Sequence, residues 1–282
     1  MFSWPANYDS CYTLAGVITR EGIGLHSGEK TRVTISSYEK EGYYVSFTDK
    51  PDEIFKLTQD AIGSTMLCTA VKLGGRNLYT IEHLLSSMAG CGLSYIHIEV
   101  EGKEIPLLDG SAIQWVRDFE EVGIKKAPRP DNFFREIHKS IILNKEGSVI
   151  AATPSEKTTI ISTISFAYKA IGNQTYVIDL NPKSFVEMIA PARTFGFKDQ
   201  FQELSELGLI KGGSLENALV CDGDKWVNPP LRFDNEPIRH KILDLIGDLA
   251  LVGLPKAQIL VYKGSHSLNA LLASSLKNQL YL

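Results

Sequence analysis

The chain has 282 residues, of which 44% are hydrophobic and 22% charged, and its formal net charge is −4. These values are typical of a globular protein and exclude a disordered or fibrous chain. Without a concentrated basic run, nucleic acid is not the favoured partner. No 18 apolar residues follow one another, so the sequence predicts no membrane-spanning helix.

Cysteine usage and the start of the chain bear on the compartment. The four cysteines, at positions 11, 68, 91 and 221, form no CxxC pair. This argues against a disulfide framework or a structural zinc knuckle. The first residues contain no Lys or Arg before Arg20 and no long apolar core, which makes a poor secretory signal. We therefore expect a cytoplasmic protein.

The first half of the sequence predicts strands followed by two helices. Residues 31–38 and 43–48 are alternating or β-branched and indicate strands. Residues 80–92 are typical of a helix that is closed by glycine. Residues 95–102 alternate strictly, as a strand does, and residues 111–123 form a second amphipathic helix.

A candidate linker lies near the middle of the chain. Residues 125–132 read KKAPRPDN, with two prolines and no periodicity. The length of the chain suits two domains of about 130 to 150 residues. We therefore expect an N-terminal α+β domain over 1–127 and a C-terminal α+β domain over 128–282.

After the linker the order of elements recurs, although no repeat is visible in the residues themselves. Strands are predicted at 140–147, 148–154, 158–166 and 257–264, and helices at 197–209, 236–253 and 267–280. Each half thus combines strands with two main helices, and the second half carries an extra helical insertion. The fold class predicted is α+β with two domains.

One helical segment carries a possible metal site. In RHKILDLIGD, residues 239–248, His240, Asp244 and Asp248 fall on one stripe at about 100° per residue. A His and an Asp four residues apart can chelate one ion, and zinc accepts both kinds of ligand. His83 is the natural third ligand. The alternative is that the stripe is an ordinary solvated face, and from this helix alone the alternative is favoured.

Two further candidates could supply acid and base groups. Glu82 precedes His83 on its predicted helix, and a Glu there could act as a base beside a metal. As a two-residue motif this pair is weak, because the same dipeptide is common on helix surfaces. His266 lies between a strand and a helix, where it could titrate near neutral pH. A capping or turn histidine is about as good an interpretation.

Taken together, the stretches resemble one family. The motifs are GIGLHSGE, TIEHLLSSMAG, EIPLLDGSA, ARTFGF, GLIKGGSLENALV, LRFDNEPIRHKILDLIGDL and GSHSLN. In order and approximate spacing they resemble those of UDP-3-O-acyl-N-acetylglucosamine deacetylase, a zinc amidase that performs the committed step of lipid A biosynthesis. The resemblance runs from about Leu14 to Leu272.

The resemblance implies a fold and a place for the active site. It implies two domains of similar topology, each a β-sheet packed with two main helices, and an active site at the domain interface. It also implies a βαβ insertion in the second domain, at about 194–222, that forms a tunnel for the hydroxyacyl chain of the substrate.

The resemblance also implies roles for individual residues. The metal ligands are His83, His240 and Asp244. The catalytic residues are Glu82 as general base, His266 as general acid, Asp248 as the carboxylate paired with it, and Thr194 as a hydroxyl that holds the oxyanion. The substrate-binding residues are Lys241, Phe195, Phe197, Met66, Leu67, Cys68 and Gly213.

Two features depart from the family pattern. The family usually has glycine directly before the general-acid histidine, whereas here Ser265 stands there and the glycine is Gly264. The first 13 residues match no family pattern. Neither departure removes a metal ligand or the base.

Three functions follow, in order of preference. The first is zinc-dependent deacetylation of UDP-3-O-(3-hydroxyacyl)-N-acetylglucosamine by a monomer that holds one Zn²⁺ per chain; Fe²⁺ would suit the same ligands. The second keeps the site but acts on another acylated sugar or small amide. The third is a non-catalytic protein that binds nucleotide sugars or lipid-linked sugars.

Overall fold

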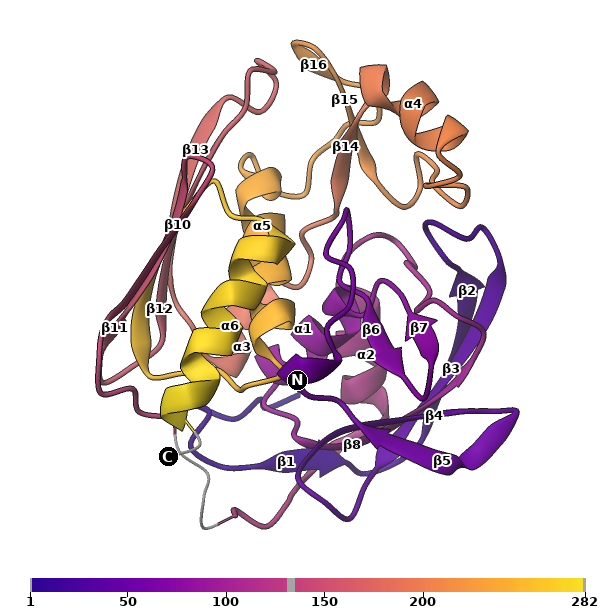
Figure 1. The fold of residues 1–282 in the computed structure, drawn as a ribbon, viewed down its shortest axis with the longest axis vertical. Coiled ribbons are helices and arrows are strands. Elements are labelled where there is room, and N and C mark those ends of the chain that lie inside the picture. Colours follow the sequence, from indigo (N-terminus) through magenta and orange to yellow (C-terminus); the bar gives the residue numbers. More distant parts are fainter. Residues whose placement is uncertain (1, 131–134, 281–282) are drawn as a thin grey trace.

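Two β-sheets enclose a layer of helices. The computed structural model describes residues 2–130 and 135–280. Figure 1 shows the helices between the two sheets, with a smaller group of strands and a short helix projecting beyond them. The mixed α+β fold expected from the sequence is confirmed.

The first sheet has its last strand at its centre. In spatial order it consists of β2 (Ile18–Ile23), β3 (Lys30–Ser37), β8 (Tyr95–Glu101), β4 (Gly42–Phe47) and β5 (Lys50–Lys56). All neighbours are antiparallel except β4 and β8, which run parallel. Alternate residues of β3, including Val33 and Ile35, are fully buried, as expected for a strand with one face on the core.

The second sheet repeats this arrangement. It consists of β10 (Ile141–Lys145), β11 (Ser148–Pro154), β17 (Ala257–Tyr262), β12 (Thr159–Ser165) and β13 (Asn173–Asp179). Again only the third and last strands of the half, β12 and β17, pair in parallel. The repeat that is invisible in the residues is therefore present in the topology.

The helices occupy equivalent places in the two halves. Helices α1 (Glu82–Gly90) and α5 (Glu236–Leu249) precede the central strands, whereas α2 (Ile113–Val122) and α6 (His266–Leu280) follow them. Helix α1 approaches α5 closely at Gly247, where a Cβ atom would lie 2.1 Å from the carbonyl oxygen of Glu82. Only glycine allows this approach, which brings the beginning of α1 against α5.

The two halves share one hydrophobic core. Buried apolar side chains of α1, such as Leu84 and Leu85, belong to the same cluster as Ile242 and Ile246 of α5 and Ile259 of β17. At about 0.8 kcal/mol for each buried CH₂ group, this contact is a main reason for the two halves to stay together. The site between them is thus held by the core itself.

The insertion has the βαβ form that the resemblance implied. It consists of β14 (Phe195–Phe197), a 3₁₀ turn (Lys198–Gln200), α4 (Phe201–Glu206), β15 (Leu219–Asp222) and β16 (Lys225–Trp226). Strand β14 runs parallel to β15. The helix predicted over 197–209 is therefore too long. Phe197 pairs with Cys221 instead, and Gly208 takes a positive φ that ends the helical segment.

Several short elements were not anticipated. Strand β1 (Tyr12–Leu14) pairs with β9 (Ile124–Lys126), and β6 (Val71–Leu73) pairs with β7 (Arg76–Leu78). A 3₁₀ turn (Gln59–Ala61) and helix α3 (Pro182–Met188) complete the described elements. The predicted linker therefore begins inside a strand, at Lys125 and Lys126. Its last two residues, Asp131 and Asn132, lie outside the described residues.

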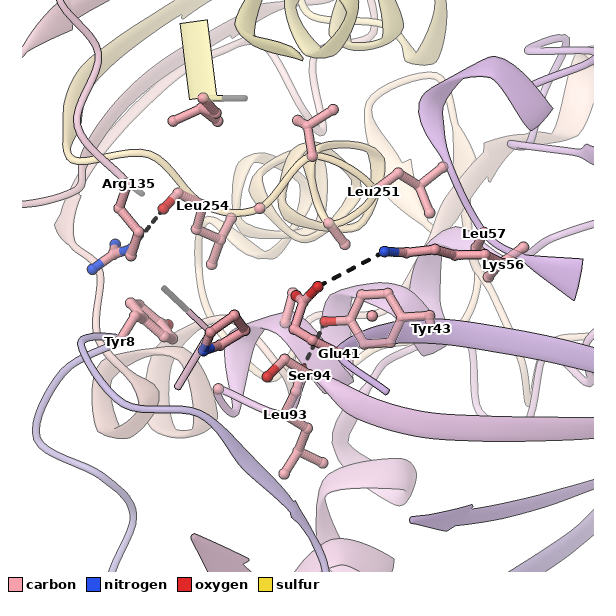
Figure 2. Close-up of a pocket in the computed structure, with 18 of the residues that line it drawn as sticks. Tyr8, Glu41, Tyr43, Lys56, Leu57, Leu93, Ser94, Arg135, Leu251 and Leu254 are labelled. Carbon is pink, nitrogen blue, oxygen red and sulfur yellow. Dashed lines mark hydrogen bonds and ion pairs between the residues drawn. The ribbon is translucent and has the colours of Figure 1, made fainter. Parts of the chain in front are cut away.

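Figure 2 shows a small cavity where the two halves meet away from the cleft described below. Its volume is about 120 Å³, and its lining comes from both halves, for example Glu41 and Lys56 from the first and Leu251 from the second. Arg135 anchors the nearby chain by donating from Nε to the carbonyl of Leu254 at 2.8 Å. Within residues 2–130 and 135–280, no helix is both long and apolar enough to cross a bilayer.

Candidate active site

Three metal-ligating side chains converge between α1 and α5. His83 comes from the first turn of α1, and His240 and Asp244 lie one turn apart on α5. One ligand atom from each lies within 4.8 Å of the others, and all three residues are buried. The Nε2 atoms of His83 and His240 are 3.7 and 3.3 Å from Oδ1 of Asp244. A solvated face of α5 is therefore the wrong interpretation of this stripe.

The protonation states of the three side chains suit a cation. Burial lowers the pKa of His83 to about 3 and also lowers the pKa of His240, so both imidazoles are neutral at pH 7. Burial by itself would raise the pKa of Asp244, but nearby positive charge, that of Lys241 above all, outweighs it and holds this pKa well below its usual range. Neutral imidazole and ionised carboxylate are the forms that bind metals.

Unpaired buried atoms also fit a metal. Oδ1 of Asp244 is buried and has no hydrogen-bond partner among the described residues, and both histidine Nε2 atoms face it. Nδ1 of His240 lies 3.1 Å from the carbonyl oxygen of Ala192 and donates to it. This leaves the lone pair of Nε2 available to bind a metal. Two imidazoles and one carboxylate are the donor set of open catalytic zinc sites. The residues present therefore fit a divalent cation.

Glu82 stands beside this cluster. It is the first residue of α1 and is 3% exposed. Its Oε2 accepts a hydrogen bond from the backbone N–H of Thr69 at 3.0 Å. Burial raises the pKa of Glu82 to about 8. A carboxylate that titrates near neutral pH has the proton affinity that a general base needs.

His266 and Asp248 form a hydrogen-bonded pair at the other side of the cluster. Nδ1 of His266 lies 2.9 Å from Oδ2 of Asp248, and Nε2 lies 4.0 Å from Oδ2 of Asp244. Burial by itself would lower the pKa of His266, but Asp248 outweighs it and raises this pKa to about 9. The imidazolium can therefore carry a proton at neutral pH and donate it.

The cluster formed by His83, His240 and Asp244 opens into a cleft of about 310 Å³. Glu82, His83, His240, Asp244, Lys241, His266 and Thr194 line it. Nζ of Lys241 donates to Oδ2 of Asp244 at 2.7 Å, and the backbone N–H of Thr194 donates to the carbonyl of Gly110 at 2.7 Å. A contact within α5 thus positions a cationic group beside the cluster, and a contact between the two halves positions the residue that carries a hydroxyl.

A larger apolar cavity of about 480 Å³ adjoins the cleft. Leu25, Leu67, Thr194, Phe195 and Phe197 line both spaces. The insertion supplies most of the remaining apolar wall, including Phe201, Leu204, Ile210, Leu215, Val220 and Val227. A polar reaction centre therefore borders a space suited to an aliphatic chain.

Comparisons with known proteins identify the family. The family model of UDP-3-O-acyl N-acetylglycosamine deacetylase matches residues 12–278. The chain belongs to this deacetylase family.

Curated relatives agree with the family match. A UDP-3-O-acyl-N-acetylglucosamine deacetylase of Trichormus variabilis is 46% identical over 269 residues, which cover 93% of this chain and 96% of the relative. The protein of that name from Synechocystis is 40% identical, with 94% and 98% covered. The one from Campylobacter jejuni is 36% identical, with 92% and 89% covered. The resemblance inferred from the motifs is thereby confirmed.

The substrate-binding residues expected from the deacetylase family fall into two groups. Lys241, Phe195, Phe197, Leu67 and Gly213 line the cleft or the apolar cavity. Two other residues line neither space: Met66 is 65% exposed and Cys68 is buried. Among the apolar side chains of the insertion, Phe197, Phe201 and Leu204 line the cavity, whereas Leu209 does not.

The departure at residue 265 has a local explanation. The hydroxyl of Ser265 accepts from the backbone N–H of Leu268 at 3.3 Å, so this serine caps α6. His266 is then the first residue of that helix. The serine thus satisfies a backbone donor in the first turn of the helix that begins with this histidine.

Two buried polar residues beside the site were not found from the sequence. Oγ1 of Thr69 donates to Oδ1 of Asp248 at 2.5 Å, and Nδ2 of Asn269 donates to Oδ2 at 2.9 Å. Thr69 directly follows the MLC stretch, and Asn269 follows His266 by almost one helical turn. Because such residues serve many local roles in a sequence, only their contacts reveal this one.

Proposed function

We propose that the protein is a zinc-dependent hydrolase that removes the N-acetyl group of UDP-3-O-(3-hydroxyacyl)-N-acetylglucosamine, the committed step of lipid A biosynthesis. The products are acetate and UDP-3-O-(3-hydroxyacyl)-glucosamine. One observation carries the proposal: in a chain of this family, His83 of one half meets His240 and Asp244 of the other, with Glu82 beside them.

The proposed resident metal is Zn²⁺, one per chain, held by His83, His240 and Asp244. A bound cation of this kind polarises the amide carbonyl and lowers the pKa of the attacking water. Fe²⁺ accepts the same ligands, so the identity of the ion rests on metal analysis of the purified protein.

Glu82 acts as the general base in this proposal. Its carboxylate takes a proton from the water molecule as the oxygen attacks the acetyl carbon. The backbone N–H of Thr69 holds one carboxylate oxygen, which leaves the other to receive the proton. Burial disfavours the charged form, so proton uptake is easier than it would be for a solvated glutamate.

Thr194 and His266 serve the later stages of the reaction. The hydroxyl of Thr194 donates to the amide oxygen as negative charge develops on it, an effect that can contribute about 3–4 kcal/mol. His266, protonated beside Asp248, donates its proton to the departing sugar nitrogen. The C–N bond then breaks, and acetate and the free amine leave.

The rest of the substrate follows the shape of the site. The apolar cavity beside the cleft receives the hydroxyacyl chain, with Phe195 and Phe197 at its entrance and the insertion around it. Lys241 offers a cation next to the reacting amide. In this role Lys241 would bind a polar oxygen of the substrate while its contact with Asp244 is retained.

We also propose a monomeric, cytoplasmic enzyme with domains 1–127 and 128–282. The repeated strand order of the two sheets supports a division near this point. All four cysteines are free and buried, which is consistent with a reducing compartment.

The test combines metal analysis with an assay on the UDP-sugar. Purified protein is expected to contain about one zinc per chain, as a three-ligand site implies. It should release acetate from UDP-3-O-(3-hydroxymyristoyl)-N-acetylglucosamine, lose this activity to a chelator, and regain it when Zn²⁺ is added. The control is His138→Ala, an exposed histidine outside the cleft.

Other acylated UDP-sugars are assayed in parallel. If folded, zinc-loaded protein hydrolyses another acylated sugar better, the substrate is wrong although the chemistry stands. If it hydrolyses none of them, the protein is a binding protein and the proposal fails.

A further inference from the structure

A buried threonine outside the two helices that carry the candidate metal ligands contacts both Glu82 and the Asp248–His266 pair. We propose that Thr69 is a positioning residue that couples Glu82 to the Asp248–His266 pair. This inference rests on the proposed function and deepens it, because it names the residue that fixes the positions of Glu82 and His266 relative to each other.

Thr69 makes a contact with each partner. Its backbone N–H donates to Oε2 of Glu82 at 3.0 Å, and its Oγ1 donates to Oδ1 of Asp248 at 2.5 Å. The same Oγ1 lies 3.3 Å from Nδ1 of His266. The residue is 1% exposed, so these bonds are shielded from bulk solvent. One residue of the first half therefore touches the base on α1, the carboxylate on α5 and the histidine on α6.

The directions of these hydrogen bonds require a proton on Nδ1 of His266. As a carboxylate, Asp248 can only accept, and its oxygens receive Thr69 at Oδ1 and both Asn269 and His266 at Oδ2. The single proton of the Thr69 hydroxyl is therefore committed to Asp248. Only lone pairs of Oγ1 face His266, so its Nδ1 must carry a proton. This leaves Nε2 as the ring nitrogen directed toward the cleft.

The loop that carries Thr69 is held in an uncommon conformation. Leu67, two residues earlier, has a φ of 61°, in the left-handed region. A leucine there costs free energy that the surroundings must offset. The loop is anchored on both sides of Thr69, because the backbone N–H of Ala70 donates to the carbonyl of Ser64 at 2.9 Å. The hydroxyl is thus presented from a defined backbone.

Replacement of the Thr69 side chain separates the effect of its hydroxyl bond to Asp248 from that of its backbone bond to Glu82. Thr69→Val keeps the shape and the backbone bond to Glu82 but removes the hydroxyl bond to Asp248. Loss of a hydrogen bond to a charged group predicts a fall in kcat of about 10- to 100-fold, with KM and zinc content unchanged. Thr69→Ser retains the hydroxyl and is expected to remain within about threefold of the original kcat, well short of the tenfold lower bound for its loss.

The matched control is Thr13→Val, because Thr13 is a buried threonine of the same half whose hydroxyl donates to the carbonyl of Tyr95. This variant is expected to keep the original kcat. A kcat of Thr69→Val within twofold of the unaltered protein would overturn the inference, as would a Thr69→Ser variant as slow as Thr69→Val.

A double substitution tests whether Thr69 acts through Asp248. If it does, Thr69→Val added to Asp248→Asn costs little further activity, because the carboxylate it orients is already absent. A full additional loss contradicts the coupling.

A second readout does not depend on turnover. In metal-free protein labelled with ¹⁵N-histidine, the Nδ1 proton resonance of His266 should shift in Thr69→Val and return in Thr69→Ser. An unchanged resonance in Thr69→Val overturns the inference. If the unaltered protein has no deacetylase activity, the proposed function fails while this measurement still decides the role of Thr69.

Discussion

The two ends of the cleft are built in opposite ways. At the metal end, Glu82, His83, His240 and Asp244 are each at most 5% exposed and come from the core helices α1 and α5. At the apolar end, the cavity is walled by short strands and a six-residue helix, and Phe201 on that helix is 50% exposed. One end is buried in the helical core beside the cleft, whereas the other is assembled on a projecting insertion (Figure 1).

The difference follows from what each end must hold. A buried charge is stable only when hydrogen bonds or opposite charges surround it, so its neighbours are determined residue by residue. An aliphatic chain requires only apolar surface of about the right width, which several side-chain arrangements can provide. Substitutions at the metal end should therefore cause large losses, and substitutions at the apolar end graded ones.

The largest effect on activity is expected for Glu82, the proposed general base. Glu82→Gln keeps the size of the side chain and the acceptor for Thr69 but cannot take up a proton. We expect kcat to fall by about 10²- to 10⁴-fold while zinc content, measured by atomic absorption, remains that of the unaltered protein. Glu187→Gln, an exposed carboxylate on α3, is the matched control. Activity of Glu82→Gln within tenfold of the original would remove Glu82 from the role of base.

A smaller effect is expected on stability, and its sign follows from the raised pKa of His266. The folded state holds the His266 proton up to a pKa of about 9, whereas the unfolded state releases it near the ordinary histidine pKa of 6.5. The stabilisation is therefore complete below pH 6.5 and is lost as the pH rises through about 9. Such a shift corresponds to about 3 kcal/mol. The raised pKa of Glu82 acts in the same direction, between pH 4.5 and about 8.

Urea unfolding of metal-free protein between pH 6 and 10 measures this dependence. The free energy of unfolding should decrease toward high pH, and His266→Gln should flatten the curve between pH 6.5 and 9. A variant at the apolar end, Phe201→Ala, should leave the slope unchanged. Equal slopes for the original protein and His266→Gln would mean that the histidine does not hold its proton in the folded state.

The smallest effect is expected at the apolar end. Phe201→Ala removes apolar surface from a half-exposed position, so we expect KM to rise about three- to tenfold for a substrate with a long acyl chain, equivalent to about 1 kcal/mol. For a short acyl chain that does not reach the cavity wall, KM should be unchanged. Leu207→Ala is the control, because Leu207 is 67% exposed and does not line the cavity. An effect independent of chain length would assign Phe201 to stability instead.

Secondary structure was predictable from the sequence where the spacing of polar and apolar residues forms a clear pattern. The helical spacing of His240, Asp244 and Asp248 placed them on one stripe, and the structure contains that helix from Glu236 to Leu249. The helix over 197–209 was overextended, because the apolar residues of FKDQF can serve a strand as well as a helix. Strand β5, with the polar residues KPDEIFK, lies at a sheet edge and gives no apolar alternation by which to find it.

By itself, the sequence determined which side chains of each helix share a face, because the geometry of a helix depends only on the separation of residues along the chain. It also contained the seven motifs that indicated the family. Only the tertiary structure decided that His83 meets the α5 pair, that the polar stripe is buried, and that Thr69 joins base and acid. These facts depend on contacts between residues more than 150 positions apart, which form where Gly247 lets α1 pack against α5. No local pattern of residues specifies such a contact.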